Sequence, residues 1–359
     1  MRIVKVSASK NYDILIASGI LEAVGEKTKS VFPKAKTVAI ITDDNVKEFY
    51  LERVEKKLSQ AGFSTVCFSI PPGEASKNAE QYFSLLNWLC KNKLTRSDII
   101  IALGGGVVGD LAGFTAATYL RGIPFVQIPT TLLAMVDSSV GGKTGIDLPA
   151  GKNLAGTFYQ PSLVLCDTET LNTLPEHVFK DGCAEVIKYG MLGSTKILEA
   201  LKEYSHGDNL DDLIEQCISI KRGIVQRDEF DTGDRMLLNF GHTIAHAIEK
   251  LSGYKISHGF AVAAGMAVDT RAAFLKGLCP KECLDVLNEL LKNFALLDNT
   301  EYSAQELFEA ALHDKKRDGE YITNVVPCAL GKCELQKIPA AFLLDWIETG
   351  LACNAESGL

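Results

Sequence analysis

The sequence predicts an α/β N-terminal domain with a Rossmann-like parallel sheet, followed by an all-α C-terminal domain. In the first half, short apolar runs alternate with helix-length amphipathic segments, a pattern typical of parallel strands joined by helices. Beyond residue 167 almost every segment favours helix. A chain of 359 residues is long enough for two domains that each bury a core. We therefore expect domains at residues 1–178 and 179–359.

The short apolar runs of the first half predict its strands. They lie at residues 2–7, 12–16, 37–42, 63–70, 99–104, 125–129 and 163–167. The run 99–104 is apolar at five of its six positions, as expected for an inner strand buried on both faces. Helices are predicted between the strands, at residues 21–32, in a segment that ends near Gly62, at 77–92 and at 107–121. Asp44 or Asn45 is expected to cap the helix that ends near Gly62.

The segments of the second half have helical rather than strand character. Helices are predicted at residues 175–192, 197–204, 210–227, 235–251, 259–276 and 280–293, with a hairpin at 321–335 as an interruption. Their length and spacing predict a helical domain without internal repeats.

The composition excludes several classes of protein. Apolar residues make up 47% and charged residues 23%, values far from those of disordered or fibrous chains. A net charge of -8 disfavours a broad surface for nucleic acid or membrane, so a small ligand is expected. No apolar run approaches the ~20 residues of a membrane span, and no signal-peptide core follows Met1. The ten cysteines lie singly in apolar runs without a C-x-x-C pair, which indicates free thiols and a cytoplasmic location.

A glycine-rich turn follows the strand at 99–104. Gly104, Gly105 and Gly106 can adopt backbone angles closed to other residues, and without a Cβ they let a phosphate approach the N–H groups of a helix that begins there. The turn therefore predicts an anion site. A solvated glycine-rich loop is the alternative, because such short motifs also occur by chance.

Cations and hydroxyl groups follow the glycine turn. Arg121, Thr130 and Thr131, Asp137, the segment 138–144 and the pair Lys152 and Asn153 come within 50 residues of it. Lysines among glycines and hydroxyls, with few acids nearby, suggest cations that await an anionic ligand.

The helical half adds residues that can bind a metal. His242 and His246 are four residues apart on one predicted helix, His258 begins the next, and Glu185 lies on the first. One glutamate and two histidines form a ligand set of catalytic zinc sites that leaves a coordination position open. Spacing alone does not decide which two histidines bind. For Glu185 an ion pair with Lys188 is the simpler alternative.

These motifs are parts of one ordered set that resembles the 3-dehydroquinate synthase family of the sugar phosphate cyclase superfamily. The matching segments lie at residues 104–114, 121–122, 127–133, 136–145, 151–153, 184–190, 238–243 and 258–259. They cover nearly the whole chain. The resemblance implies a dehydroquinate synthase-like fold, with zinc or cobalt bound by Glu185, His242 and His258. His246 would then serve the substrate.

The resemblance also implies an NAD site at the glycine turn. Its expected members are Asp43, Pro72, Gly73, Glu74, Ala75, Ser76, Lys77, Gly106, Val107, Val108, Gly109, Asp110, Thr130, Thr131, Asp137, Lys143, Lys152, Thr170, Leu171, Asn172 and Thr173. An ordinary Rossmann motif has an acid ~20 residues after the turn, which this chain lacks. Asp43, on an earlier strand, is the expected ribose partner.

The implied substrate, 3-deoxy-D-arabino-heptulosonate 7-phosphate, carries a carboxylate and a phosphate. Its expected contacts are Arg121, Asp137, Lys143, Lys152, Asn153, Lys188, Lys221, Arg235, Asn239, His246 and one of Lys315 and Lys316. Lys221 and Arg235 would bind the carboxylate, and Asn153, Asn239 and His246 the phosphate. Arg121 would reach across from a partner subunit, which implies a homodimer.

The implied reaction removes hydride with NAD, eliminates phosphate, returns the hydride and closes the ring by aldol addition to give 3-dehydroquinate. Alternatives are another sugar phosphate cyclase, such as a 2-deoxy-scyllo-inosose synthase, a metal-dependent polyol dehydrogenase, and a binding protein that keeps NAD for structure. Phe260 departs from the family, which commonly has an acid after the His258-Gly259 pair. If that acid orients the imidazole, its loss would weaken metal binding.

Overall fold

The computed structural model describes residues 1–205, 207–315 and 321–352, which form two compact units. The first unit comprises Met1–Pro175 and Asn209–Glu229, and the second comprises Glu176–Asp208 and Phe230–Leu359. The chain therefore leaves the first unit, returns to it for one helix, and leaves it again. The domains expected at residues 1–178 and 179–359 stay a prediction.

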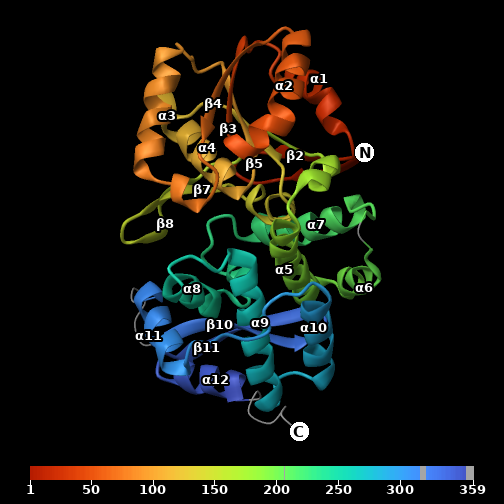
Figure 1. Cartoon of the computed structure of the whole chain (residues 1–359), viewed down its shortest axis with the longest axis vertical. Helices are drawn as coiled ribbons and strands as arrows, with labels where there is room; N and C mark the ends of the chain where they lie inside the picture. The colour runs from red at the N-terminus through yellow and green to blue at the C-terminus, as the bar shows by residue number, and fades with distance from the viewer. Residues whose placement is uncertain (206, 316–320, 353–359) are drawn as a thin grey trace. The chain divides into compact units, whose positions relative to one another are not determined.

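The first unit is built on a seven-stranded sheet (Figure 1). The strand order is β1-β2-β9-β6-β5-β3-β4. β1 and β2 pair antiparallel, and all the other neighbouring strands pair parallel, so the sheet is mixed and mostly parallel. The strand bounds are β1 (Arg2–Val6), β2 (Tyr12–Ile16), β3 (Thr37–Asp43), β4 (Ser64–Ile70), β5 (Ile99–Gly104), β6 (Phe125–Pro129) and β9 (Leu163–Cys166).

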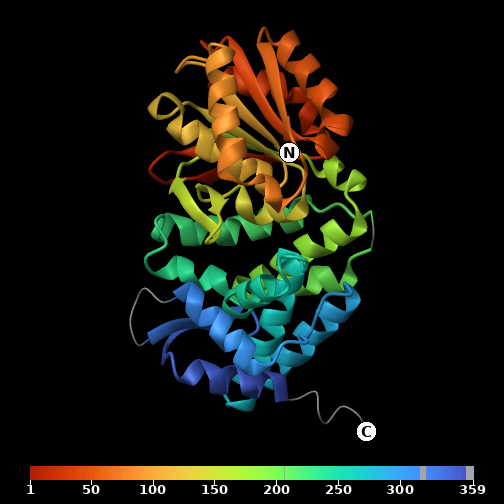
Figure 2. The ribbon, with the colours of Figure 1, turned by 60° about the vertical axis from the view of Figure 1, so that its left-hand side comes forward.

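Helices cover both faces of this sheet. Val38 and Ile40 of β3 pack in one apolar cluster with residues of α1 (Val24–Val31) and α2 (Asp44–Gln60). Ala39 and Ile41 point the other way, into a cluster with α3 (Ala79–Lys91) and α4 (Gly106–Thr118). The alternation of side chains along a strand thus gives three layers, and Figure 2 shows α3 in front of the sheet.

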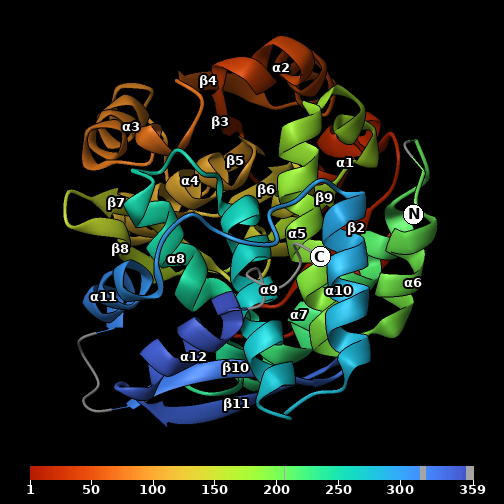
Figure 3. The ribbon, with the colours of Figure 1, turned by 60° about the horizontal axis from the view of Figure 1, so that its bottom comes forward.

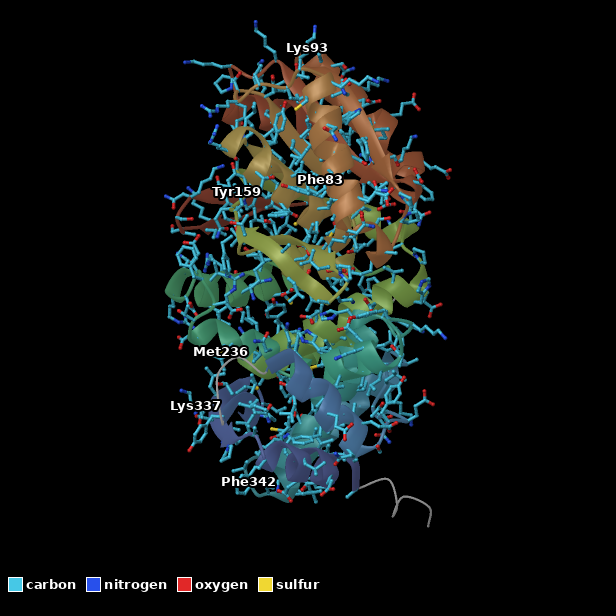
Figure 4. All side chains as sticks on the ribbon, turned by 90° about the vertical axis from the view of Figure 1, so that its left-hand side faces the viewer. Phe83, Lys93, Tyr159, Met236, Lys337 and Phe342 are labelled. Carbon is cyan, nitrogen blue, oxygen red and sulfur yellow. The ribbon has the colours of Figure 1, made fainter. Side chains whose placement is uncertain are left out.

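The first unit also contains elements that the sequence did not predict. A two-stranded hairpin, β7 (Lys143–Leu148) and β8 (Gly151–Phe158), follows a π-helical turn at Ala134–Ser138. Tyr159, labelled in Figure 4, directly follows the hairpin; its hydroxyl donates to Ile123 O at 2.8 Å and its ring stacks on Phe125. These contacts attach the end of the hairpin to the start of β6. α7 (Asp211–Arg227), which was predicted as a helix at 210–227, completes the unit.

The second unit is mainly helical and is organised around α9. Its elements are α5 (Glu176–Gly193), α6 (Thr195–Glu203), α8 (His242–Leu251), α9 (His258–Leu275), α10 (Lys281–Asn293), α11 (Ala304–Lys315), the hairpin β10 (Tyr321–Ala329) and β11 (Lys332–Pro339), and α12 (Phe342–Leu351). α9 is buried along almost its whole length and lies against α5, α8, α10 and α12 (Figure 3). Its alanines and glycines allow this close packing on several sides.

One predicted helix of the second unit is broken in the structure. The segment 235–251 forms a 3₁₀ helix, Asp234–Asn239, and then α8. Gly241 separates them with a φ of 78°, and a Cβ there would lie 2.8 Å from the backbone nitrogen of Met266. Only glycine satisfies both conditions without strain. α11 and α12 were not predicted.

No helix among the described residues is both long enough and apolar enough to cross a membrane. The nine cysteines of the described part are free, and six of them are buried.

Candidate metal centre and nucleotide-binding edge

The carboxyl ends of the parallel strands carry the segments that were predicted to bind NAD. Asp43 ends β3, residues 72–77 follow β4, residues 106–110 follow β5, Thr130 and Thr131 follow β6, and residues 170–173 follow β9. Because these strands are parallel neighbours, all five segments lie at one edge of the sheet. Ligands of open α/β sheets bind at this edge.

The glycine turn works through small size rather than unusual backbone angles. None of Gly104, Gly105 and Gly106 has a positive φ, so the expectation about their angles is wrong. Instead a Cβ on Gly104 would lie 2.7 Å from the side chain of Val108. Gly105 is the N-cap of α4, so the first N–H groups of that helix stand at the turn without side chains of Gly105 or Gly106 to cover them.

Asp43 caps α2, in place of the predicted Asp44 or Asn45. Its carboxylate accepts from the backbone N–H groups of Asn45 and Val46, each at 3.0 Å. Burial raises the pKa of Asp43 against these hydrogen bonds. The helix begins one or two residues earlier than expected because the capping side chain lies on the last residue of the strand.

Lys77 lies at the same edge, surrounded by three carboxylates. Its ammonium lies 2.8 Å from Glu74, 3.3 Å from Asp110 and 3.8 Å from Asp147, and its side chain is 5% exposed. Burial raises the pKa of Asp110 to about 6, and Lys77 opposes that rise. Burial would lower the pKa of Lys77, but the three carboxylates outweigh it and raise that pKa. Lys152 approaches the same group, 3.8 Å from Glu74.

Lys221 and Asp137 are brought together within the first unit. Lys221 of α7 donates to the backbone carbonyl of Asp137 at 2.6 Å and to its carboxylate at 2.8 Å. Asp137 lies in the π-helical turn, a rare element that often marks functional sites. Lys221 is buried, so its charge is balanced inside the protein.

Three of the predicted substrate contacts in the first unit, Arg121, Lys143 and Asn153, are exposed. Arg121 and the preceding Leu120 both have positive φ, 66° and 51°, and Arg121 is exposed. Asn153, in β8, also has a positive φ of 56° and donates its backbone N–H to Asp147 at 2.8 Å. Lys143 begins β7 and is exposed. Unfavourable backbone angles in non-glycine residues often occur at functional positions.

The second unit brings Glu185, His242 and His258 together. Nε2 of His242 lies 3.7 Å and Nε2 of His258 lies 3.6 Å from Oε1 of Glu185. One ligand atom from each residue lies within 4.8 Å of the other two, and in the described part of the chain no further group of this kind occurs. Glu185 is fully buried on α5, while the two histidines are the first residues of α8 and α9. Carboxylate and imidazole ligands in this arrangement fit a divalent metal.

The outer nitrogens of both imidazoles have partners that orient the rings. Nδ1 of His242 lies 3.0 Å from the carbonyl oxygen of Phe240, which favours the tautomer whose Nε2 is free to bind a metal. Nδ1 of His258 lies 3.6 Å from the carboxylate of Glu249. Burial lowers the pKa of His242, aided by Lys188. Burial also acts to lower the pKa of His258, but Glu185 and Glu249 raise it to about 10.

The two carboxylate oxygens of Glu185 face different partners. Lys188 forms the ion pair that their spacing suggested, through Oε2 of Glu185, while Oε1 faces the two imidazoles. His246 lies outside the group of three, with its ring centroid 5.7 Å from that of His242.

Arg235 is buried in the 3₁₀ helix before α8, and Asn239 ends that helix. Lys316 and the side chain of Lys315 lie outside the described residues.

Two acidic residues near Glu185, His242 and His258 were not predicted from the sequence. Glu249 lies seven residues after His242, two turns along the same helix face, and this spacing was the available signal. Asp181 lies four residues before Glu185 on α5, and its carboxylate accepts from the backbone N–H of Phe260 at 3.2 Å. Although residue 260 is not acidic, His258 has an acidic neighbour in Glu249 of α8.

The chain matches two family descriptions in succession. Residues 67–181 match "3-dehydroquinate synthase N-terminal" and residues 182–317 match "3-dehydroquinate synthase C-terminal". The 3-dehydroquinate synthase of Streptococcus suis (strain 05ZYH33) is 45% identical over 344 residues, which cover 94% of this chain and 97% of that protein.

Two solved structures have the same fold. A 2-deoxy-scyllo-inosose synthase, complexed with carbaglucose-6-phosphate, NAD+ and Co2+, superposes with a TM-score of 0.84 at 24% identity and covers 98% of this chain and 100% of its own. The 2-epi-5-epi-valiolone synthase from Streptomyces hygroscopicus subsp. jinggangensis 5008, with NAD+ and Zn2+ bound, has a TM-score of 0.86 at 25% identity, with 98% and 99% covered.

Proposed function

The chain belongs to the 3-dehydroquinate synthase family, and from that membership we propose how its own residues carry the reaction. The activity is that of a 3-dehydroquinate synthase, EC 4.2.3.4, in the shikimate pathway. It converts 3-deoxy-D-arabino-heptulosonate 7-phosphate into 3-dehydroquinate and phosphate. The convergence of Glu185, His242 and His258 on one point is the observation that carries the assignment of the site.

We propose that these three residues hold zinc or cobalt. The donor set fits such an ion, because it combines one buried carboxylate with two imidazoles whose Nε2 atoms face it. When bound there, the metal supplies Lewis-acid activation of substrate hydroxyl groups. Lys188 balances the buried carboxylate, and Phe240 and Glu249 hold the imidazole rings in orientation.

We propose that NAD binds along the strand edge. The N–H groups at the start of α4 fit its pyrophosphate, and Asp43 on the neighbouring strand fits a ribose hydroxyl. When bound, NAD supplies a hydride acceptor that is regenerated in the same cycle. The full proposed NAD site consists of the residues that the resemblance implied in the sequence analysis, the first of which is Asp43 and the last Thr173.

We propose that the substrate's two anionic groups are bound by different residues. Lys221 and Arg235, both buried, take the carboxylate, and Asn153, Asn239 and His246 take the phosphate. A buried cation attracts an anion more strongly than an exposed one, because less water screens the charge. Arg121, Asp137, Lys143, Lys152, Lys188 and one of Lys315 and Lys316 complete the proposed set.

We further propose a cytoplasmic homodimer in which Arg121 serves the partner's site. The exposed position of Arg121 and its unfavourable backbone angles support this role. Light scattering should give the mass of a dimer. Mixing an Arg121→Ala chain with a His242→Ala chain should restore part of the activity that each lacks alone, and no restoration would refute the shared site.

The function is tested by following two products at once. The purified protein with NAD and Zn²⁺ or Co²⁺ should release phosphate from 3-deoxy-D-arabino-heptulosonate 7-phosphate while absorbance of NADH stays flat. Steady accumulation of NADH would indicate a dehydrogenase instead. Glucose 6-phosphate, which has no carboxylate, serves as the control substrate. Phosphate release from it at a comparable rate would contradict the roles of Lys221 and Arg235.

A further inference from the structure

Asp181 of α5 caps the N-terminus of α9 with its side chain, because the N-cap residue of α9 does not. Ser257 is the N-cap residue of α9, and its side chain makes no capping hydrogen bond. Oδ1 of Asp181 instead accepts from the backbone N–H of Gly259 at 2.8 Å and of Phe260 at 3.2 Å. These are the N–H groups that an N-cap side chain ordinarily satisfies. The hydroxyl of Ser257 donates to the same oxygen at 2.5 Å.

This cap fixes the position of a proposed metal ligand. His258 is the first residue of α9, so it lies between Ser257 and Gly259, which both bond to Asp181. Asp181 and Glu185 are four residues apart on α5 and therefore share one face of that helix. One rigid helix thus carries both the cap that places His258 and the carboxylate that faces it at 3.6 Å.

Gly259 makes this arrangement sterically possible. A Cβ at this position would lie 1.9 Å from the backbone oxygen of Asp181, so any side chain would push α9 away from α5. The glycine after the histidine is therefore explained by the close approach of the two helices, and its φ is not positive.

We propose that Asp181 is a positioning residue for the metal centre, which sets the distance between His258 and Glu185 by anchoring the first turn of α9 to α5. The proposal rests on the metal assignment made above and extends it beyond the three ligands. Residues that orient metal ligands typically affect metal affinity 10- to 100-fold, so Asp181→Ala is expected to weaken metal binding by about that factor.

The test measures metal affinity and stability separately. Apo protein is titrated with Zn²⁺ against a chromophoric chelator, and the Co²⁺ spectrum reports the geometry of the ligands. Asp181→Ala should raise the Kd for Zn²⁺ and alter the Co²⁺ spectrum, while Asp181→Asn, which keeps an acceptor oxygen, should raise the Kd by less than about tenfold. If Asp181→Ala does not fold, Asp181→Glu is measured in its place, because the longer side chain moves the carboxylate oxygen away from the first turn of α9. An unchanged Kd for Zn²⁺ in Asp181→Glu would then overturn the proposal.

Asp98→Ala is the matched control for a loss of stability alone. Asp98 also accepts three hydrogen bonds, from the backbone of Thr37 and from the backbone and hydroxyl of Thr95, but it lies in the first unit. It should lower Tm and leave the Kd unchanged. If Asp181→Ala behaves in the same way, Asp181 is only a structural cap and the proposal is wrong. If His242→Ala binds metal as the wild type does, the metal assignment itself fails, and the role of Asp181 with it.

Discussion

Lys77 offers the sharpest test of how charge is balanced at the strand edge. In Lys77→Met the side chain keeps a similar length, but Glu74, Asp110 and Asp147 lose the cation that lies within 3.8 Å of all three. Removing one partner of a buried ion pair typically costs about 3–5 kcal/mol, because a charge is left uncompensated. The side chain of Lys77 is 5% exposed, but the three carboxylates are 20% to 36% exposed, so water screens part of this loss. We expect a decrease at or below the lower end of that range in the free energy of unfolding, measured by urea denaturation without NAD.

The pH dependence of the loss provides an independent check. The pKa of Asp110 is already raised by burial to about 6, and loss of the cation should raise it further. A carboxyl group whose pKa is higher in the folded state stabilises the fold at low pH, and this contribution is lost as the pH rises through the folded pKa. The difference between wild type and Lys77→Met should therefore be largest above the raised pKa of the variant and shrink as the pH falls toward about 6, where Asp110 becomes protonated in both proteins.

Lys57→Met is the matched control. Lys57 pairs with Glu22 at 2.7 Å, but both side chains are more exposed, at 28% and 54%, and Arg53 also contacts Glu22. The same substitution should therefore change stability far less and without the same pH dependence. A loss for Lys77→Met no larger than that for Lys57→Met would refute the reasoning.

Two further substitutions test the second unit. His242→Ala should abolish bound metal and activity, whereas His246→Ala should keep the metal and lose turnover. Metal analysis combined with an activity assay distinguishes the two variants. The reverse pattern would mean that the roles of His242 and His246 were assigned wrongly. Gly241→Ala should lower the free energy of unfolding by about 2–5 kcal/mol, from left-handed strain and from crowding against Met266. Gly253→Ala, with a φ of 62° and no neighbour within 4 Å, isolates the strain and should cost clearly less; equal losses would exclude crowding.

Local patterns were enough to predict most elements, whereas the three proposed metal ligands were predicted from the family resemblance. The apolar run 99–104 predicted β5 to the residue, because a strand buried on both faces needs no partner information to be recognised. Membership of Glu185, His242 and His258 in one site came from the ordered motifs, and the structure brings their ligand atoms together. The predicted mixture of a strand-rich half and a helical half is confirmed in outline.

Contacts between distant segments explain what the sequence did not reveal. Glu74 and Lys77 are three residues apart, but Asp110 and Asp147 reach Lys77 only when three separate segments meet, which sequence spacing does not indicate. Likewise the break at Gly241 depends on α9, whose backbone leaves no room for a Cβ there. Hydrophobic periodicity indicates which face of a single segment is buried, so it does not predict contacts between segments that lie far apart in the sequence.

The return of α7 to the first unit has a consequence for biosynthesis. Arg2 of β1 donates to Glu215 at 2.6 Å and Thr168, just after β9, donates to Asp211 at 2.8 Å. Two parts of the first unit therefore obtain these partners only from a helix that is synthesised much later. On the ribosome, this unit stays incomplete until residue 227 has emerged, and by then α5 and α6 have already been synthesised. A fragment that stops at residue 175 would expose the surface that α7 buries and depend on a chaperone or on the missing piece supplied in trans.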